Sequence, residues 1–206
     1  MFIQQMQVGH MAVFAYLVGD PVTGDALVID PADNAHEILA EASKNKLRIN
    51  SIVNTHGHVD HIGGNADMKE KTGADIIIHE EDAPMLTSTP SMMLRMFNAK
   101  QSPPADILVK DGNIITIGAV QLQVIHTPGH SPGGMALYHP GFVFTGDTLF
   151  VEGVGRSDLP GGSRDNFGHT MTALDRGNDW AFADTLDGVG TSSFPNWALI
   201  DRKSVV

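Results

Sequence analysis

The segment "NTHGHVDHIGG", residues 54–64, places three histidines and one aspartate within six consecutive positions. It follows the apolar run "INSIV", which predicts a buried strand that leads into the cluster. Several ionisable side chains gathered at the end of a buried strand are costly to bury unless they share a partner. A fold for this chain must therefore bring further polar groups, from distant parts of the sequence, to the end of this strand.

The residue types of the cluster indicate a metal site. The chain contains no cysteine, so a metal ion would have to use imidazole and carboxylate ligands, which borderline cations such as Zn²⁺ accept. Side chains two positions apart in an extended segment point the same way, so His56 and His58 can converge on one ion. If the chain then enters a helix, Asp60 and His61 point towards a second position nearby. Solvated loop histidines are the alternative interpretation.

One short motif cannot complete a coordination sphere, so we expect further ligands elsewhere in the chain. In "HTPGHSPGG", residues 126–134, His130 lies in a Gly- and Pro-rich loop directly after a predicted strand, where ligands are often presented. We interpret His126 chiefly as a residue of that strand. In "FVFTGDTLF", residues 142–150, Asp147 follows another apolar strand and can bridge two cations through its two carboxylate oxygens.

Hydrophobic periodicity predicts strands and helices in alternation, followed by mainly strands. Helices are expected over 34–47, with Asn34 as N-cap, and over 63–73, ended by Gly73. A last helix is expected over 163–177. The Met-rich segment over residues 80–106 could form a helix and a loop that lie over the site. Alternatively, its methionines could belong to the hydrophobic core or to an adaptable surface. Strands are expected over 11–20, 26–30, 49–55, 74–79 and in several runs from 107 to 150.

Length and composition favour one globular domain over residues 1–206. The formal net charge of −11, without any cluster of Lys and Arg, argues against a nucleic-acid partner. No apolar run approaches the roughly 18 residues that a membrane span needs, and the N-terminus "MFIQQMQVGHMAVF" lacks the pattern of a signal peptide. With no cysteine, the chain is expected in the cytoplasm.

Three motifs, "THGHVDH", "TPGHSPGG" and "GDTLFVEGVGRSDLPGG", resemble the successive motifs of the metallo-β-lactamase fold superfamily. They are most similar to those of its glyoxalase II-like (hydroxyacylglutathione hydrolase-like) branch, over about residues 10–175. The resemblance implies a four-layer αββα sandwich of the α/β (α+β) class, with a metal site at one edge between the two sheets.

The resemblance also implies a role for each member of the cluster. Zn²⁺ is the expected ion, one or two per chain, with iron or manganese as alternatives. The resemblance implies that His56, His58 and His130 bind the first metal. It implies that Asp60 and His61 bind the second metal and that Asp147 bridges the two.

The C-terminal part departs from the family pattern. The family normally supplies one more histidine to the second metal, from a "GHG"-like motif near the C-terminus. The last histidine here is His169, within the predicted helix over 163–177, where the family places no ligand. We therefore expect the second metal to bind more weakly than the first.

Residues 177–206 form an atypical tail without clear periodicity, and it contains both tryptophans, Trp180 and Trp197. Three explanations are open: divergence, a frameshift after about residue 176, or a partner chain that supplies the missing ligand or covers the site. The tail could also pair with a second copy of the chain in a homo-oligomer, and local packing is the alternative.

The resemblance favours a hydrolase in which metal-activated water attacks the carbonyl of a small-molecule thioester or ester, and in which Asp60 orients the water. Thr55, Thr127 and Asp158 are candidates to orient the imidazoles, although a purely structural role suits them better. We expect Arg156 to pair with Asp158 and to shape the wall of the site.

Two other functions stay open. The persulfide dioxygenase branch of the same superfamily uses one iron and shares the "GRSD" element, whereas "DLPGG" is more similar to the hydrolases. A catalytically impaired metal-binding protein would fit the missing histidine. A β-lactamase proper is disfavoured by the missing signal peptide. A nuclease is disfavoured by the negative charge.

Overall fold

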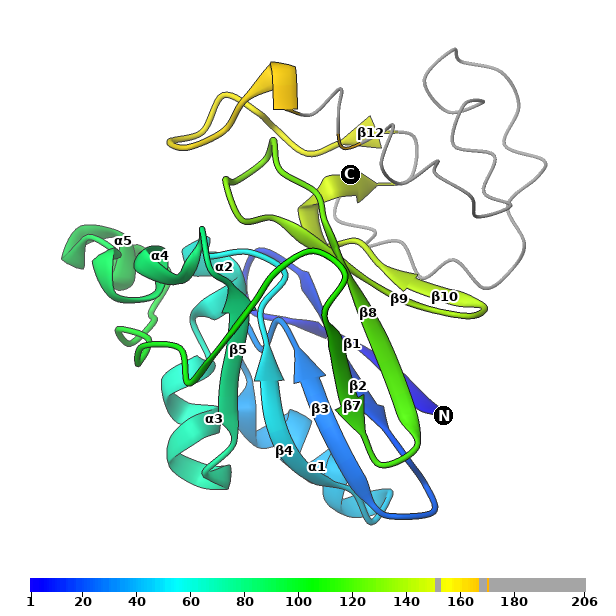
Figure 1. Cartoon of the computed structure of the whole chain (residues 1–206). Coiled ribbons are helices and arrows are strands. Elements are labelled where there is room, and N and C mark those ends of the chain that lie inside the picture. Colours follow the sequence, from blue (N-terminus) through cyan, green and yellow to red (C-terminus); the bar gives the residue numbers. More distant parts are fainter. Residues whose placement is uncertain (151–152, 167–169, 171–206) are drawn as a thin grey trace.

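The apolar segments of the first half of the chain pair into one sheet in the computed structural model, which describes residues 1–150, 153–166 and 170 (Figure 1). The six strands stand in the sheet in their sequence order. The first three are antiparallel neighbours, and β3 to β6 run parallel. The strands are β1 (Phe2–Val8), β2 (Val13–Gly19), β3 (Asp25–Ile29), β4 (Arg48–Val53), β5 (Asp75–His79) and β6 (Ile107–Val109).

A second sheet follows and is antiparallel throughout, in the order β10-β9-β8-β7. Its residues alternate between the buried and the exposed face along β8, as the sequence predicts for a half-buried strand. A short two-stranded ribbon comes after it. These strands are β7 (Ile114–Ile117), β8 (Val120–His126), β9 (Met135–His139), β10 (Phe142–Phe144), β11 (Leu149–Phe150) and β12 (Gly153–Val154).

The helices lie between the parallel strands in sequence, as the alternating pattern predicts. A single turn of 3₁₀ helix, Gly146–Thr148, follows β10. None of the helices in the described residues is long and apolar enough to cross a membrane. The α-helices are α1 (Ala35–Lys44), α2 (Val59–Ile62), α3 (Asn65–Thr72), α4 (Ala83–Ser88) and α5 (Ser91–Met96).

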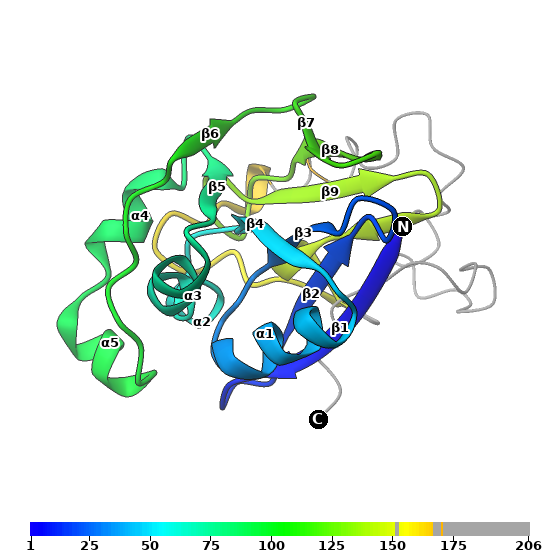
Figure 2. The same ribbon diagram turned by 90° about the horizontal axis from the view of Figure 1, so that it is seen from below.

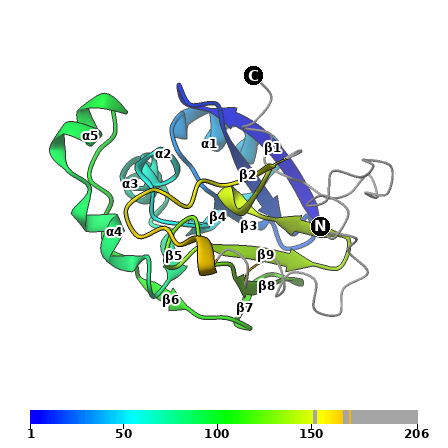
Figure 3. The ribbon, with the colours of Figure 1, turned by 90° about the horizontal axis from the view of Figure 1, so that it is seen from above.

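Two hydrophobic cores hold these layers together. One lies between the first sheet and the helices, where Ile38 of α1 and Met68 of α3 pack on the strands. The other lies between the two sheets, where the rings of Tyr16 and Phe144 meet edge to face at 5.1 Å. Seen along the strands, the layers run from α1 through the first sheet to the second sheet (Figures 2 and 3). This mixed α/β arrangement confirms the predicted fold class.

The topology gathers strand ends at one edge of the sandwich. Because β1, β3, β4 and β5 run in one direction, their carboxyl ends lie at the same edge of the first sheet. This edge is the upper end of the first sheet in Figure 1, near α2 and α4. The backbone N–H of Met135, at the start of β9, donates to the carbonyl of Thr55 at 2.9 Å and so ties the second sheet to this edge.

Some local predictions need correction. Three strands precede α1 rather than the two predicted, because β1 also joins the sheet. Asn34 occupies the N-cap position as predicted, but its φ is 55° and its side chain makes no capping hydrogen bond. Instead, its amide donates to the carboxylate of Glu37 at 3.0 Å. Gly73 ends α3 with φ 70°, as expected of a glycine at this position.

The predicted C-terminal elements fall largely outside the described residues. Residues 164–166 are helical, and the hydroxyl of Ser163 accepts a hydrogen bond from the N–H of Asn166 at 3.2 Å, which is typical of an N-cap. The rest of the predicted helix, His169 and the tail over 177–206 lie outside the part of the chain that the structure describes.

Candidate metal centre

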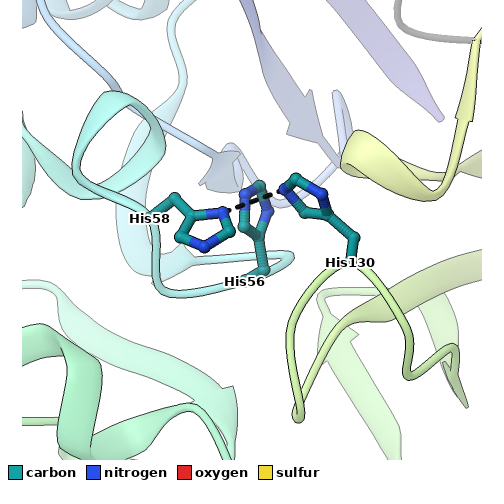
Figure 4. A group of neighbouring side chains, drawn as sticks. All are labelled: His56, His58 and His130. Carbon is teal, nitrogen blue, oxygen red and sulfur yellow. Dashed lines mark hydrogen bonds between the residues drawn. The ribbon is translucent and has the colours of Figure 1, made fainter. Parts of the chain in front are cut away.

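Three histidines from two loops meet at the edge described above. His56 and His58 follow β4, and His130 lies in the loop between β8 and β9. A ligand atom from each of the three lies within 4.8 Å of the others. The ring of His58 stands at 84° to that of His56 and at 86° to that of His130, and the three rings lie next to one another (Figure 4). This arrangement is typical of imidazoles around an ion.

Hydrogen bonds fix which nitrogen two of the three imidazoles present. Nδ1 of His130 donates to the carbonyl of Arg156 at 2.7 Å, since a carbonyl can only accept, and this leaves the lone pair on Nε2. The hydroxyl of Thr55 donates to Asp30 at 2.6 Å and accepts from Nδ1 of His56 at 3.1 Å. His56 therefore also presents Nε2 to the centre. Such contacts to the far nitrogen are typical of metal-binding histidines.

The three imidazoles fit a bound cation. Nδ1 of His58 lies 2.9 Å from Nε2 of His130, and two lone pairs at this distance need a proton or a cation between them. Burial, and secondarily the neighbouring His130, lowers the pKa of His58 to about 4. At neutral pH the ring is therefore uncharged, which is the form that binds metals.

A second group of donors surrounds His61, whose side chain is fully buried. Its Nδ1 lies 2.9 Å from the buried carboxylate of Asp30, and its Nε2 lies 3.1 Å from Asp147 and 3.9 Å from Asp60. If Nδ1–H donates to Asp30, the lone pair of Nε2 faces two carboxylates. A cation between these groups would remove the repulsion, so the arrangement suits a second ion.

Asp147 lies between the two groups. One carboxylate oxygen is 3.1 Å from Nε2 of His61, and the other is 3.5 Å from Nε2 of His130. The structure therefore brings all six predicted site residues to one place. The position of Asp147 between the two histidines is the one that a bridging ligand would need.

A buried carboxylate that the sequence did not single out ties the two histidine loops together. Asp82, just before α4, is completely buried. Its two oxygens accept from the backbone N–H of Gly57 at 2.9 Å and from that of Gly133 at 2.5 Å. Gly57 separates His56 from His58, and Gly133 lies in the loop of His130. We call this contact the Asp82 clamp.

The two glycines of the Asp82 clamp are required for close approach. A Cβ atom at Gly57 would lie 2.5 Å from the Cβ of Met85, and one at Gly133 would lie 2.5 Å from the backbone nitrogen of Asp82. Distances this short are not tolerated between these atoms. The loops can therefore reach the Asp82 carboxylate only because both positions lack a side chain.

A third cluster, His79, Glu81 and His126, has a different geometry. Donor atoms of the three lie within 4.8 Å of one another, but the rings of His79 and His126 stack in parallel, 4.1 Å apart and at 10°. An ion cannot lie in both ring planes at once in this arrangement. Nε2 of His126 donates to the carbonyl of Pro132 at 2.9 Å. His126 is a strand residue, as predicted, and it supports the loop that carries His130.

The other candidates differ in their contacts. Thr55 contacts His56 directly, as given above, whereas the hydroxyl of Thr127 lies 2.9 Å from that of Thr148 rather than from an imidazole. Asp158 pairs with Arg156 at 2.9 and 3.0 Å on the surface, as expected, and this hydrogen bond lowers the pKa of Asp158 to about 2. Arg156 contributes to the site through its backbone carbonyl.

The geometry and the sequence together place the chain in a known family. The family model described as "Metallo-beta-lactamase superfamily" matches residues 8–189. The chain belongs to the metallo-β-lactamase superfamily. In this metallo-β-lactamase fold, the clusters of histidine and aspartate described above are groups that could hold a metal ion. They do not by themselves identify the metal.

Similar proteins of this superfamily include a probable metallo-hydrolase, YqgX of Bacillus subtilis. It is 33% identical over 168 residues, which cover 79% of this chain and 78% of that protein. The crystal structure of TTHA1623 in a di-iron-bound form has a TM-score of 0.74 and 31% identity, and covers 83% of this chain and 85% of that chain.

Hydroxyacylglutathione hydrolases are also homologues of the chain, as the resemblance predicts. The enzyme of Maricaulis maris is 35% identical over 145 residues, which cover 69% of this chain and 50% of that protein. The chain thus matches about half the length of this relative.

Asp30, Asp82 and the carbonyl of Arg156 are the site groups that sequence reasoning missed. Asp30 follows the apolar strand β3, which is the parallel neighbour of β4, so its place at the same edge could have been anticipated. Asp82 lies three residues after the end of β5 and gave a weaker signal of the same kind. A backbone carbonyl has no signature in the sequence.

Proposed function

We propose that the protein is a metal-dependent hydrolase of a small-molecule ester or thioester. The observation that carries the proposal is the set of three imidazoles, His56, His58 and His130, that converge beside Asp147. In two of them, a hydrogen bond to Nδ1 leaves Nε2 as the nitrogen that can act as a metal ligand. The superfamily and its probable metallo-hydrolase member support hydrolysis. The thioester rests on the similarity to hydroxyacylglutathione hydrolases.

The proposed ligand set follows the two groups of donors. A bound metal ion would act as a Lewis acid and would lower the pKa of a coordinated water towards about 7. Zn²⁺ is our first choice, and iron is supported by the di-iron form of TTHA1623. We propose His56, His58 and His130 as ligands of the first metal, and Asp60 and His61 as ligands of the second. Asp147 would bind both.

Asp60 has the properties that a residue orienting water needs. Its side chain is 19% exposed, whereas that of His61 is fully buried. Asp60 also lines an apolar pocket next to the site. A carboxylate there can accept a hydrogen bond from the attacking water and hold its oxygen towards the substrate carbonyl. Asp30 and Arg156 do not touch the substrate in this proposal, and they hold His61 and His130 in the ligand tautomer.

Metal analysis combined with a hydrolysis assay tests this proposal. We expect the purified chain to retain metal and to hydrolyse acyl thioesters or esters, and His130→Ala to lose both tightly bound metal and turnover. Lys110→Ala is a suitable control because Lys110 forms a surface ion pair with Glu80. Hydrolysis that survives the loss of His130 would exclude the proposed role of this residue.

A mononuclear iron persulfide dioxygenase is the second candidate. The missing C-terminal histidine favours one well-served metal over two, and the di-iron form of TTHA1623 supports the binding of iron by this fold. Iron content, measured together with oxygen uptake in the presence of glutathione persulfide, separates this oxidoreductase from the hydrolase. A metal-loaded chain inactive in both assays would point to a catalytically impaired metal-binding protein.

A further inference from the structure

A small apolar pocket of about 120 Å³ adjoins the metal centre at Asp60. Its walls come from four parts of the chain: the β1–β2 turn with the strand residues beside it, the segment between β3 and α1, the first residues of α2, and the end of α5. Val8, Val13 and Val59 line it and are at most 5% exposed, so they form a fixed apolar floor. Because Val59 lies between His58 and Asp60 in sequence, this floor begins directly beside the candidate ligands.

The rim of the pocket consists of more adaptable side chains. Met11, in the β1–β2 turn, is 53% exposed, and Met96, the last residue of α5, is 70% exposed. Phe97 completes this wall and is partly buried. Methionine is unbranched and flexible, and it moulds itself to irregular apolar ligands. A rigid floor with an adaptable rim suits a flexible aliphatic group.

We propose that this pocket binds the apolar acyl group of the substrate while the carbonyl to be attacked lies at the metal centre. The inference rests on the proposed hydrolase function and names the class of substrate: esters or thioesters of short aliphatic acids. Asp60 lines the pocket and lies 3.9 Å from Nε2 of His61, so the pocket and the metal centre share a residue.

The size and charge of the pocket favour the acyl group over the leaving group. With a volume of about 120 Å³, the pocket is well below the roughly 300–1,000 Å³ of sites for drug-sized ligands, so it suits a short aliphatic chain. A peptide-like or nucleotide-like carrier is larger and polar. His10, Asp33 and Asp60 also line the pocket, and the two carboxylates would repel an anionic group there. The polar carrier is therefore placed outside the pocket.

The proposal predicts a dependence on chain length. Each methylene group that leaves water for an apolar site changes affinity about fourfold. We expect the binding of straight-chain carboxylic acids, the acyl products, to strengthen about fourfold per added carbon from acetate to about hexanoate, and then to level off. In thioesters that share one leaving group, kcat/KM should rise over the same range.

The test uses the metal-loaded full chain and two matched variants. Calorimetry measures the binding of acetate to octanoate, and a hydrolysis assay measures the acyl series in parallel. Met96→Ser should flatten the dependence of both on chain length, because it replaces an apolar wall of the pocket. Met92→Ser is the matched control: Met92 is 67% exposed on the same helix but does not line the pocket, so its series should equal that of the wild type.

The outcomes separate this inference from the proposed function. Acid binding that does not vary with chain length in the wild type, or an equal dependence in Met96→Ser, would overturn the acyl pocket even if esters are hydrolysed. A chain-length dependence of acid binding without hydrolysis of any ester or thioester would support the pocket and contradict the hydrolase.

Discussion

At the scale of the residue, His61 is positioned through both of its ring nitrogens. One faces the buried carboxylate of Asp30, and the other faces Asp147 and Asp60. Asp30 also accepts from the backbone N–H of Thr55 at 2.8 Å and from its hydroxyl at 2.6 Å. One carboxylate thus sets the tautomer of His61 and, through Thr55, that of His56.

This arrangement predicts the effect of Asp30→Asn. An amide supplies one acceptor oxygen and two N–H donors, so it cannot accept all the hydrogen bonds that reach Asp30. We expect metal affinity to fall about 10- to 100-fold, as is typical when such a partner of a metal-binding histidine is lost. Competition with a chelator measures the effect. Asp25→Asn, which changes a carboxylate at the start of β3, the strand that Asp30 follows, should leave the affinity unchanged.

The lowered pKa of His58 predicts a pH-dependent stability of the chelator-treated protein. Because the folded pKa of about 4 lies below the ordinary value of 6.5, the unfolded chain binds more protons between these two values. The free energy of unfolding should therefore fall as the pH decreases from about 6.5 towards 4, by up to about 3 kcal/mol. Denaturant titrations check this, and His58→Gln should reduce the slope. An equal slope in the variant would contradict the assignment.

At the scale of the element, two loops from different sheets have to meet for the first cluster to exist. The loop after β4 carries His56 and His58, and the loop between β8 and β9 carries His130. The Asp82 clamp joins them through backbone N–H groups, so it acts on the positions of the loops rather than on any imidazole. Metal binding and loop packing are therefore coupled.

Replacing the Asp82 carboxylate by an amide should loosen both loops. In Asp82→Asn only one oxygen remains, and the N–H of Gly57 or of Gly133 then faces an amide N–H without a good acceptor. Loss of such a buried hydrogen bond costs roughly 1–3 kcal/mol. We expect a lower free energy of unfolding and a weaker first metal, both measured on the variant. Glu80→Gln, at an exposed residue two positions earlier, is the control. Unchanged metal affinity would show that the clamp does not position the histidines.

At the scale of the whole molecule, the two metal positions are expected to differ. The first has three histidines that lie together, whereas for the second the sequence predicts that the C-terminal histidine implied by the family resemblance is missing. His169 lies outside the described residues. The single domain, the small-molecule partner, the possible homo-oligomer and the cytoplasmic location also stay predictions.

This asymmetry leads to a stoichiometry prediction for the full chain. We expect one equivalent of metal to survive dialysis against a moderate chelator and a second to be lost first, because fewer protein ligands hold it. Elemental analysis at increasing chelator concentration separates the two. Two equivalents held with equal affinity would contradict the expected weakness of the second position and would call for another ligand, from the tail or from a partner chain.

Much of the fold was readable because its signals are local. The apolar runs that became β2 to β5, the glycine that ends α3 and the alternation along β8 each depend on the residues themselves. The strand β1 was missed because three glutamines interrupt its apolar residues in "FIQQMQV". Most of the strand is only partly buried, so folding does not require a continuous apolar run there.

The sequence by itself determined the donor set: the clustered histidines, the metal chemistry that follows from having no cysteine, and the distant His130 and Asp147. Only the tertiary structure decided how each imidazole is held, since Asp30, Asp82 and the carbonyl of Arg156 act through contacts between strand ends far apart in the chain. It also placed His126 outside the cluster of His56, His58 and His130, with its ring stacked on His79. Residue type sets which atoms can bind a metal, whereas the direction of a lone pair depends on neighbours that only folding brings together.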